Sequence, residues 1–516
     1  MENRHIFSKK EVEVLLKNCE NSTLGQIDNK HIFENYEDTK LQKGIAGTVI
    51  EQCVFGYPPD NKQEADLVID NKPTELKTTG IIKDRDGNYK AKEPVSITAV
   101  SVYNISNEFF EESHFWKKLE NLLFVYYEYV KIAGRKMTPY DYKDFPYKGY
   151  YFNTISTEDK ELFKADWENV HSLVFDITSK YNQINDEKKW KELVKEEYIN
   201  RRKEIRKRGL NFIDLAPKFP PRFRLKPSYA SFIISKWLDK KFDEANVKLP
   251  DELDIRCREI ENDFSGKTLL EISKKLGLVI DDNNAKSIAE IVITTLFTGK
   301  SCKLNNIDLF VKFGIIAKTC AYTSTGSLAE DTKLFQVDFE DYTKEKIIYY
   351  NDEDELCEKE YEFEDSDLYN YFSNNQFLAI IFEEPEPKYV KVNGVRKKVN
   401  HPLMLNKFIR FKRFSFSDDF INTVVKKLWD DTRDKILNNK LKDIITIKKG
   451  KPLILKNGEI SSSPNFYRSS DNPVFIKGGA TDSTSKYKIE EVNGIKMIKQ
   501  HVWIHKKAFK KILEEE

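Results

Sequence analysis

The feature that most constrains this chain is a short segment in which two carboxylates and a lysine flank a tight turn. It runs from Asp66 to Lys77, and the apolar run after Asp66 predicts a strand that ends at the turn-forming pair Asp70-Asn71. A two-residue hairpin loop at this pair places Asp66 directly opposite Glu75. Lys77 lies on the same face because side chains alternate along a strand, so the segment predicts three convergent charged groups.

This convergence predicts a catalytic site. Two carboxylates can hold Mg²⁺ and an adjacent lysine can activate water, so the chain is a candidate phosphodiesterase. A salt-bridged surface hairpin is the alternative, because 33% of the residues are charged and short patterns of this kind also arise by chance. Pro73 limits the second strand, which must be an edge at that residue or begin later, since proline cannot donate a ladder hydrogen bond.

Composition bounds the class of protein. A chain of 516 residues predicts two or three domains. The 85 basic and 84 acidic residues leave a formal charge of +1, so any nucleic-acid binding must come from local basic patches. No apolar run reaches the roughly 20 residues of a membrane span and no secretory signal is expected, which predicts a soluble cytoplasmic protein. Free thiols in a reducing cytosol fit the scattered cysteines, which are Cys19, Cys53, Cys257, Cys302, Cys320 and Cys357.

Two helices are predicted before the charged segment, over residues 8–18 and 45–55, and the second is expected to end at Gly56. On the second helix Gly47 and Glu51 share one i, i+4 row, which leaves room around Glu51 about one turn before the exit toward the hairpin. A role in the site and an ordinary solvated position both remain open for Glu51.

Strands are predicted after the hairpin over residues 95–102 and 122–130, and the apolar character of the second predicts that it is buried. Lys118, the last residue of a Trp-Lys-Lys run between them, can open onto the same cavity as the three charged groups. Residues 186–208 predict a charged helix with a basic end, a pattern that usually marks a solvated face.

Basic and aromatic residues interleave shortly before residue 230, a pattern that suits phosphate contact combined with stacking. The candidate DNA contacts in this stretch are Arg222, Arg224, Lys226, Ser228 and Tyr229. Residues 239–265 are polar and charged and predict a connection between domains, followed by helical segments over roughly 268–298.

A second half that starts near residue 301 repeats the order of the first. Ile307–Val311 followed by Ile315–Thr319 parallels the charged hairpin, and Phe377–Glu383 parallels the buried strand that follows it. Two similar elements in the same order indicate a duplication.

The second copy is predicted to lack a metal site. Ile316 stands where the first half has Glu75, and an isoleucine side chain cannot ligate a divalent cation. We therefore predict a mixed α/β fold of two related domains, over residues 1–240 and 301–516, joined by a helical connection over 241–300.

Several of these stretches together resemble a known family. They are Lys43–Glu51, Asp66, Glu75–Lys77, Phe124–Val130, Val425–Thr432 and Lys499–Ile504. They resemble the MutH and Sau-type restriction endonucleases, which belong to the Asp…Glu-x-Lys nuclease superfamily and cut DNA at GATC. The similarity spans nearly the whole chain, in the two-domain layout of the larger restriction enzymes and not the single domain of MutH.

The resemblance implies a Mg²⁺-dependent nuclease with a restriction-endonuclease-like core. Asp66 and Glu75 would ligate the metal, with the carbonyl group of Leu76 as a further ligand. Lys77 would orient or deprotonate the attacking water and stabilise the developing charge.

The resemblance also implies roles for two residues outside the hairpin. Glu51 matches the family's additional acidic residue near the metals, and Lys118 matches a lysine that contacts the scissile phosphate. The second half would be an inactive copy that binds another DNA site and acts as an allosteric effector. The implied binding partner is double-stranded DNA, to which the protein would bind as a monomer or a dimer. A cognate DNA methyltransferase of the same system is implied as a functional partner that does not bind the protein.

Two regions depart from the family pattern. Residues 215–218 and the following Arg222–Tyr229 are shorter and richer in proline, and Ile476–Gly479 replaces a different stretch in relatives. Both lie where bases would be read, and Lys477 and Lys499 are the candidate DNA contacts of the second region. Cleavage chemistry is therefore better supported than recognition of GATC.

Three functions are compatible with these patterns. The favoured one is a type II restriction endonuclease that makes double-strand cuts. A strand-nicking mismatch-repair endonuclease shares the chemistry but would not be expected to carry a duplicated second half. In a non-catalytic sequence-specific DNA-binding protein, Asp66 and Glu75 would be ordinary surface residues.

Overall fold

The computed structural model describes residues 5–36, 44–57, 65–83, 87–130, 138–216, 219–245, 247–280, 287–300, 303–350, 356–392, 395–399, 401–448, 450–479 and 484–515. The chain forms two compact units, one of residues 1–240 with 346–360 and the other of residues 241–345 with 361–516. Among the residues named in the sequence predictions, Lys43, Pro217, Lys218 and Cys302 lie outside the described residues.

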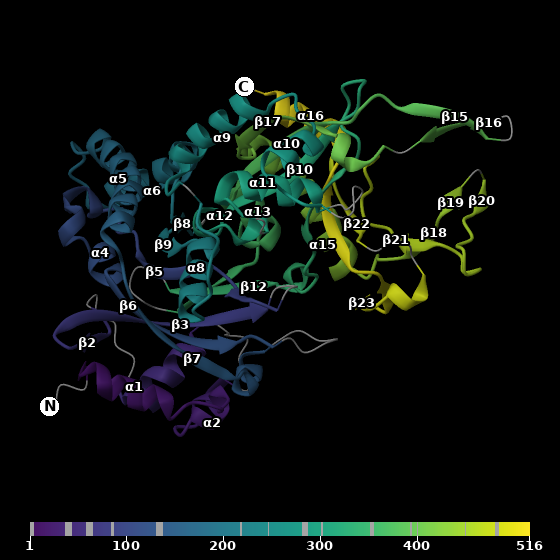
Figure 1. Cartoon of the computed structure of the whole chain (residues 1–516). Coiled ribbons are helices and arrows are strands. Elements are labelled where there is room, and N and C mark those ends of the chain that lie inside the picture. The colour runs from purple at the N-terminus through teal and green to yellow at the C-terminus, as the bar shows by residue number, and fades with distance from the viewer. Residues whose placement is uncertain are drawn as a thin grey trace. The chain divides into compact units, whose positions relative to one another are not determined.

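A mixed six-stranded sheet forms the centre of the first unit (Figure 1). Its strands in spatial order are β1 (Ile6–Phe7), β2 (Leu67–Ile69), β3 (Lys72–Lys83), β6 (Asn121–Glu128) and β7 (Tyr147–Thr154), with β4 (Tyr89–Ala91) beside β3. β3 and β6 are parallel, whereas β6 and β7 are antiparallel. The predicted mixed α/β architecture is confirmed for this unit, and the run predicted over 122–130 forms β6.

Side chains on the two faces of β6 contact different elements because they alternate along the strand. Leu123 and Val125 belong to a buried cluster that includes residues of α1 (Lys9–Lys17), α2 (Leu24–Ile27) and α3 (Ile45–Val49). Tyr126 lies on the other face, where its ring centre is 4.6 Å from that of Trp237 in α8 (Pro227–Trp237). Both faces of the sheet are therefore covered by helices.

The two helices predicted before the hairpin are present. The first is α1, which begins with a capping box between Ser8 and Glu11. The second starts as α3 and continues as a π-helix, η2 (Ile50–Phe55), that contains Glu51. It ends as predicted at Gly56, whose φ of +81° favours glycine because other side chains rarely adopt it.

The predicted hairpin register is also confirmed. Leu67 pairs with Thr74 and Ile69 with Lys72, so a two-residue turn lies between β2 and β3. Asp70 and Asn71, which form this turn, have φ values of +48° and +63°, as a type I′ turn requires.

A smaller sheet packs in the same unit. Its strands in spatial order are β5 (Val95–Ala99), β9 (Arg222–Leu225) and β8 (Ile213–Leu215), all antiparallel. Asp166 of α5 (Thr157–Lys180) holds the entry to β8, because its carboxylate accepts N–H bonds from Asn211 at 2.7 Å, Phe212 at 2.8 Å and Ile213 at 3.1 Å. The short β5 replaces the longer strand predicted over 95–102.

The second unit contains two sheets with the same strand order as those of the first. In one, β10 (Ile315–Tyr322) pairs in parallel with β14 (Gln376–Glu383), which pairs antiparallel with β17 (Lys407–Phe414). In the other, the order is β11 (Thr332–Gln336), β25 (Gln500–Ile504) and β22 (Val474–Gly478), with the last strand in the chain at the centre. These arrangements repeat β3-β6-β7 and β5-β9-β8.

One predicted parallel between the halves is wrong. The segment 307–311 is not a strand equivalent to β2, because Asp308–Phe313 forms helix α12 and ends at Gly314 in a left-handed conformation. A short apolar run fits either a strand or a buried helix, and the glycine stop favours the helix.

The strands β6 and β14 are each preceded by the same kind of helix start. Before β6, the Ser113 hydroxyl donates to the Phe110 carbonyl at 2.7 Å and caps α4 (His114–Leu119). Before β14, the Ser366 hydroxyl donates to the Phe363 carbonyl at 2.5 Å and caps α13 (Asp367–Asn374). The sequences Phe-Glu-Glu-Ser and Phe-Glu-Asp-Ser thus form equivalent turns.

The remaining helices surround these sheets. Those of the first unit are α6 (Glu187–Arg201) and α7 (Lys203–Arg208), which occupy the predicted charged helix. Those of the second unit are α9 (Pro250–Phe264), α10 (Leu269–Lys275), α11 (Ile288–Thr298), α14 (Asp418–Phe420), the π-helix η10 (Ile421–Val425), α15 (Lys426–Leu437) and α16 (Lys506–Glu514). No helix within the described ranges has the length and apolarity needed to cross a bilayer.

Replacing Asp166 with alanine should destabilise the first unit strongly, because three backbone N–H groups, two of them buried, would lose their acceptor. We expect a loss of roughly 3 kcal/mol or more in the free energy of unfolding, measured from urea transitions. Glu168→Ala, at an exposed position on the same helix, is the matched control and should change stability by less than about 0.5 kcal/mol. Equal urea midpoints for the two variants would contradict this role of Asp166.

Candidate active site

Asp66, Glu75 and Lys77 meet at the open end of the β2–β3 hairpin. Asp66 precedes β2, and its Oδ2 atom accepts the backbone N–H of Leu76 at 2.9 Å. Glu75 is only 2% exposed, and its Oε1 atom lies 2.7 Å from the Lys77 ammonium nitrogen. The side chains of Glu75 and Lys77 share one face of β3 while Leu76 points into the helix-covered cluster on the other.

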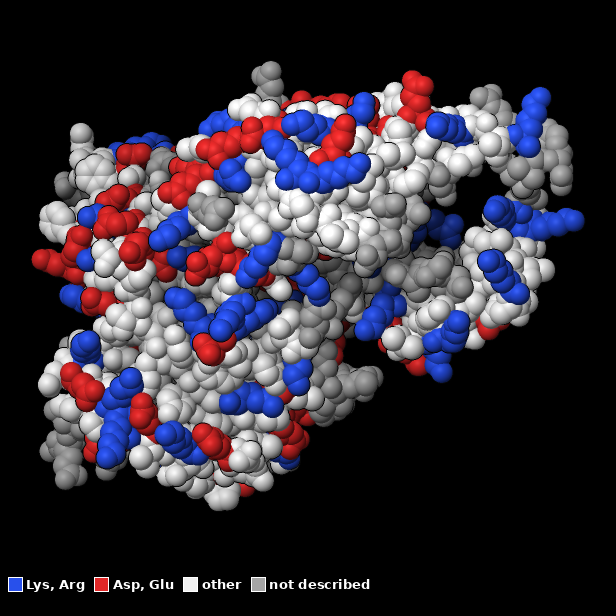
Figure 2. Space-filling view, viewed as in Figure 1, with Lys and Arg blue, Asp and Glu red and all other residues white. Residues whose placement is uncertain are grey.

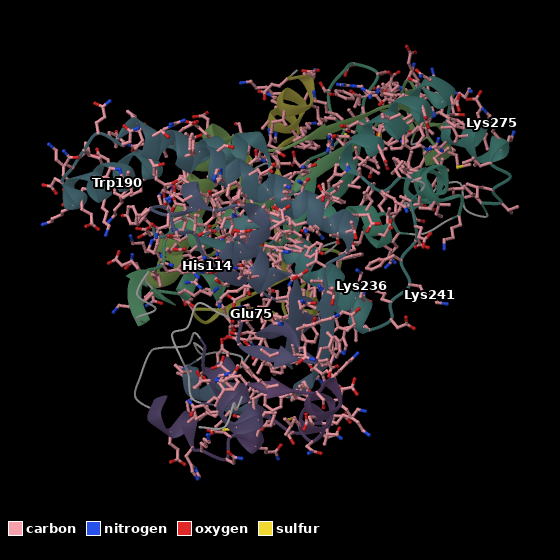
Figure 3. All side chains as sticks on the ribbon, turned by 90° about the vertical axis from the view of Figure 1, so that its left-hand side faces the viewer. Glu75, His114, Trp190, Lys236, Lys241 and Lys275 are labelled. Atoms are coloured by element: carbon pink, nitrogen blue, oxygen red, sulfur yellow. The ribbon has the colours of Figure 1, made fainter. Side chains whose placement is uncertain are left out.

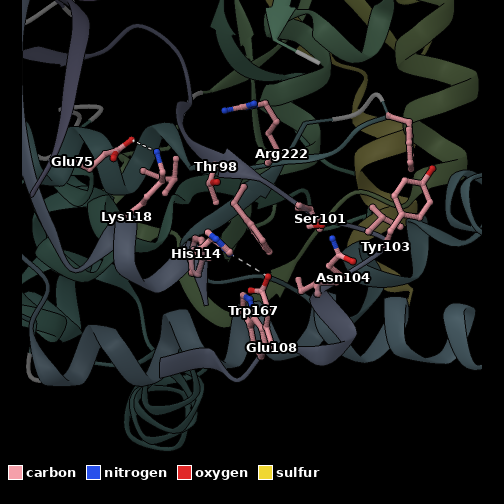
Figure 4. Close-up of a pocket in the computed structure, with 18 of the residues that line it drawn as sticks. Glu75, Thr98, Ser101, Tyr103, Asn104, Glu108, His114, Lys118, Trp167 and Arg222 are labelled. Atoms are coloured by element: carbon pink, nitrogen blue, oxygen red, sulfur yellow. Dashed lines mark hydrogen bonds and ion pairs between the residues drawn. The ribbon is translucent and has the colours of Figure 1, made fainter. Parts of the chain in front are cut away.

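A second lysine reaches Glu75 from helix α4. Lys118 lies in the last turn of this helix, and its ammonium nitrogen is 3.2 Å from the same Oε1 atom (Figure 4). Glu75 is therefore neutralised by two ammonium groups that come from different elements. The other oxygen, Oε2, is buried and accepts no hydrogen bond from any described residue.

The Asp66 carboxyl is held in an environment that disfavours its charge. Burial raises its pKa from 3.8 to about 6, and the neighbouring Glu75 carboxylate adds to the rise. Lys77 and Lys118 act in the opposite direction but do not offset it. A further cation beside Asp66 would relieve this conflict.

These groups fit Mg²⁺. Two carboxylates lie together, and one buried carboxylate oxygen lacks a donor, which is the chemistry a hard cation needs. In the part of the chain that the structure describes, no three His, Cys, Asp or Glu side chains form a metal cluster. The protein would thus supply two carboxylates, and the carbonyl of Leu76, water and phosphate oxygens would supply the rest, as is usual for Mg²⁺.

A cavity of about 370 Å³ opens beside these residues within the first unit (Figure 4). Glu75, Lys77 and Lys118 line one end, and Arg222 of β9 lines another part. The Arg222 side chain is positioned by a 3.0 Å bond from its Nε atom to the Ser96 hydroxyl. The further lining residues come from β5, the loop after it, α4 and α5, and from β9 and the segment just before it.

Sequence reasoning missed His114, which also lines the cavity. Its ring nitrogen lies 3.4 Å from a Glu108 carboxylate oxygen, and Figure 3 shows Glu75 and His114 in the same region of the first unit. The spacing could have revealed it, because His114 and Lys118 lie four residues apart and so share one helix face. Trp167 of α5 lines the cavity too, but it comes from a distant segment that no local pattern indicates.

Glu51 is not among the described residues that line the cavity. It is half-buried on the π-helix, and its Oε1 atom lies near Gly47, where an added Cβ would be 3.7 Å away. The predicted shared row of Gly47 and Glu51 is therefore present, whereas its role at the metal stays a prediction.

The predicted DNA contacts around β9 have different surroundings. Lys226 and Tyr229 are buried, Lys226 donating to the carbonyl of Leu210 and the Tyr229 hydroxyl to Asp159 at 2.8 Å. The Arg224 guanidinium pairs with Asp214, and Ser228 is half-buried in the first turn of α8. These contacts place Lys226 and Tyr229 in the interior of the unit, so only Arg222 of this group faces the cavity. Lys226 and Tyr229 thus help to hold a central strand and its helix, and the DNA contacts expected of this group stay predictions.

The two remaining candidates lie in the second unit. Lys477 on β22 is exposed, with its ammonium nitrogen 5.1 Å from the centre of the Trp503 ring. Lys499 is also exposed and precedes β25, the strand that pairs with β22.

Comparison with known proteins agrees with this geometry. Residues 55–166 match the family described as the DNA mismatch repair enzyme MutH, a span that contains the hairpin and Lys118. The type II restriction enzyme Sau3AI of Staphylococcus aureus is 24% identical to this chain, with 93% of this chain and 94% of that enzyme aligned. The chain thus carries a MutH-family domain and has distant full-length homology to a type II restriction enzyme.

The raised pKa of Asp66 predicts a measurable pH dependence. The folded state keeps the proton that the unfolded state loses near pH 3.8, so this stabilising contribution disappears as the pH rises through about 6. Without metal, the free energy of unfolding of Asp66→Asn, measured relative to that of the wild type, should therefore rise by up to about 3 kcal/mol between these pH values.

Mg²⁺ should reverse the difference. It should raise the Tm of the wild type more at about pH 7.5 than at about pH 5, because the proton competes for Asp66. Glu108→Gln, in the same cavity, should keep this response, and Asp66→Asn should lose most of it. An unchanged response in Asp66→Asn would remove Asp66 from the metal site.

Proposed function

We propose that this chain, a distant homologue of a type II restriction enzyme with a MutH-family domain, is itself a site-specific deoxyribonuclease that makes Mg²⁺-dependent double-strand cuts. The observation that carries the proposal is the meeting of Glu75, Lys77 and Lys118 at one end of a cavity that Arg222 also lines, with the Asp66 carboxyl next to Glu75. A surface hairpin would not bury Glu75 to 2% exposure. The DNA sequence that it recognises would be short, and the family resemblance implies GATC or a related sequence.

Asp66 and Glu75 would hold Mg²⁺, which when bound polarises water and neutralises charge on the phosphate. Lys77, 2.7 Å from Glu75, is placed to orient the attacking water and to hold a proton at its Nζ atom. Lys118 offers a second ammonium group from α4, suited to an oxygen of the scissile phosphate. Arg222 can contact a flanking phosphate from the cavity wall.

The second unit would be a related domain without catalytic activity. Ile316 pairs with the second residue of β14 just as Glu75 pairs with the second residue of β6. Lys318 then corresponds to Lys77, but its ammonium group donates to two backbone carbonyls, of Lys333 and Leu334, at 2.9 Å each. The equal strand orders and helix starts of the two units support a duplication, with the second copy binding DNA as an effector.

Glu75→Gln should lower the rate of plasmid cleavage by about 10²–10⁴-fold, because a neutral amide binds Mg²⁺ poorly. Duplex binding should change little, since phosphate contacts supply most of the affinity. Glu112→Gln, at an exposed site just before α4, is the matched control and should cleave normally. Full activity of purified Glu75→Gln would defeat the assignment.

The product also distinguishes the candidate functions. Linear fragments support a restriction enzyme, nicked circles support a mismatch-repair type of endonuclease, and intact plasmid with bound protein indicates a DNA-binding protein only.

The effector role predicts stimulation in trans. A short duplex that contains the recognition site should accelerate cutting of a plasmid with a single site, whereas a duplex of scrambled sequence should not. No acceleration at any duplex concentration would refute an effector function of the second unit.

A further inference from the structure

The second unit carries a projecting ribbon over residues 442–464, here called the isoleucine ribbon (Figure 1). Its base is β18 (Asp443–Ile445) paired with β21 (Ser462–Pro464). Beyond the base, one hairpin pairs β19 (Ile447–Lys448) with β20 (Lys451–Pro452), and a bridge between Ile454 and Ile460 closes a second loop. The ribbon thus ends in two narrow tips.

Apolar side chains on this ribbon face solvent. Ile447 is 60% exposed, Ile454 66% and Ile460 52%, and Ile444 and Ile445 are exposed as well. Isolated exposed aliphatic residues are common, but five within 17 positions, from 444 to 460, form an apolar surface that indicates a binding partner.

The same ribbon is strongly basic. Lys442, Lys448, Lys451 and Lys456 are exposed, and none of them forms an ion pair with a residue in the described ranges. The two acidic residues of the ribbon are already used. Asp443 contacts Lys488 at 3.3 Å, and Glu459 accepts both the N–H and the hydroxyl of Ser485 at 2.7 Å.

The register separates these two kinds of side chain. Lys448 lies directly opposite Lys451, whereas Ile447 lies opposite Pro452, so the tip has one cationic and one apolar face. Two lysines opposite each other repel, and an anion between them removes the repulsion. Regularly spaced phosphates supply such anions on both sides of a DNA groove.

A second projecting ribbon in this unit has similar composition. It pairs β15 (Lys388–Val392) with β16 (Val395–Val399), contains five lysines and arginines and no acidic residue, and exposes Tyr389 and Val390. Figure 2 shows lysine and arginine atoms on both projecting ribbons of this unit, with few acidic atoms on the visible face. Charge therefore favours a polyanion over another protein surface.

We propose that the isoleucine ribbon binds the minor groove of duplex DNA and bends it. Lys448 and Lys451 contact phosphates, and Ile447 and Ile454 enter between base steps as apolar wedges, which kinks the duplex. This rests on the proposed function, in which the protein acts on DNA, and adds to it a contact and a deformation of the DNA by the second unit.

The test uses the full-length protein in EDTA and a GATC-containing duplex of about three helical turns with a donor and an acceptor dye at its ends. Ile447→Ser with Ile454→Ser should reduce bending and weaken binding by about tenfold, with an unchanged salt dependence. Lys448→Ala with Lys451→Ala should reduce the slope of log K against log salt by about 1.8, because two phosphate contacts are lost.

Matched controls lie elsewhere in the same unit. One control is Ile255→Ser on α9, where the isoleucine side chain is 52% exposed, and the other is Lys274→Ala with Lys275→Ala on α10. Both should bind and bend DNA like the wild type. Normal bending by the isoleucine variant would overturn the proposal. The proposal would also be overturned if the isoleucine variant changed its self-association, measured by sedimentation, but bound and bent DNA normally. The ribbon would then be a contact between copies of the chain. Plasmid cleavage by the wild-type protein separates the two proposals. If the wild type does not cleave, the proposed nuclease function is wrong. If it cleaves while the variants bend DNA normally, only the proposed role of the isoleucine ribbon is wrong.

Discussion

The two-residue turn at Asp70-Asn71 is the constraint on which the candidate site depends. A turn of this length fixes the register of β2 against β3, and the alternation of side chains then decides which residues face the cavity. A slip by one residue would turn Glu75 and Lys77 into the apolar cluster and Leu76 into the cavity. The site and the core of the first unit are thus fixed by the same backbone geometry, and neither can shift without the other.

Burial creates an electrostatic conflict at this site that the protein only partly resolves. Glu75 is balanced by two ammonium groups, whereas Asp66, beside it, has its pKa raised by burial and by the Glu75 charge. A buried like-charged pair is unfavourable for folding and favourable for cation binding, because the incoming ion removes the repulsion. Such a conflict is typical of groups kept for chemistry and not for stability.

Local patterns predicted the hairpin well, because its register depends on two adjacent residues, and they predicted the stop at Gly56 for the same reason. The cavity could not be predicted in full, since Trp167 and Arg222 join it through pairings between segments far apart in the chain. Local patterns also do not distinguish interior contacts from surface contacts when the residue types are the same. The basic and aromatic residues around β9 suggested phosphate contact, yet Lys226 and Tyr229 bind Leu210 and Asp159 in the interior.

Helix α12 has a consequence for what a substitution in the second unit could achieve. In the first unit Asp66 lies directly before β2, the strand that pairs with β3, whereas the second unit has a helix before β10. Ile316→Glu would add one carboxylate to β10, where helix α12 takes the place of a strand that could carry an opposing aspartate and where Lys318 already donates to two carbonyls. A single substitution at Ile316 therefore does not create the charged cluster of the first unit, which also depends on a hairpin that precedes β3.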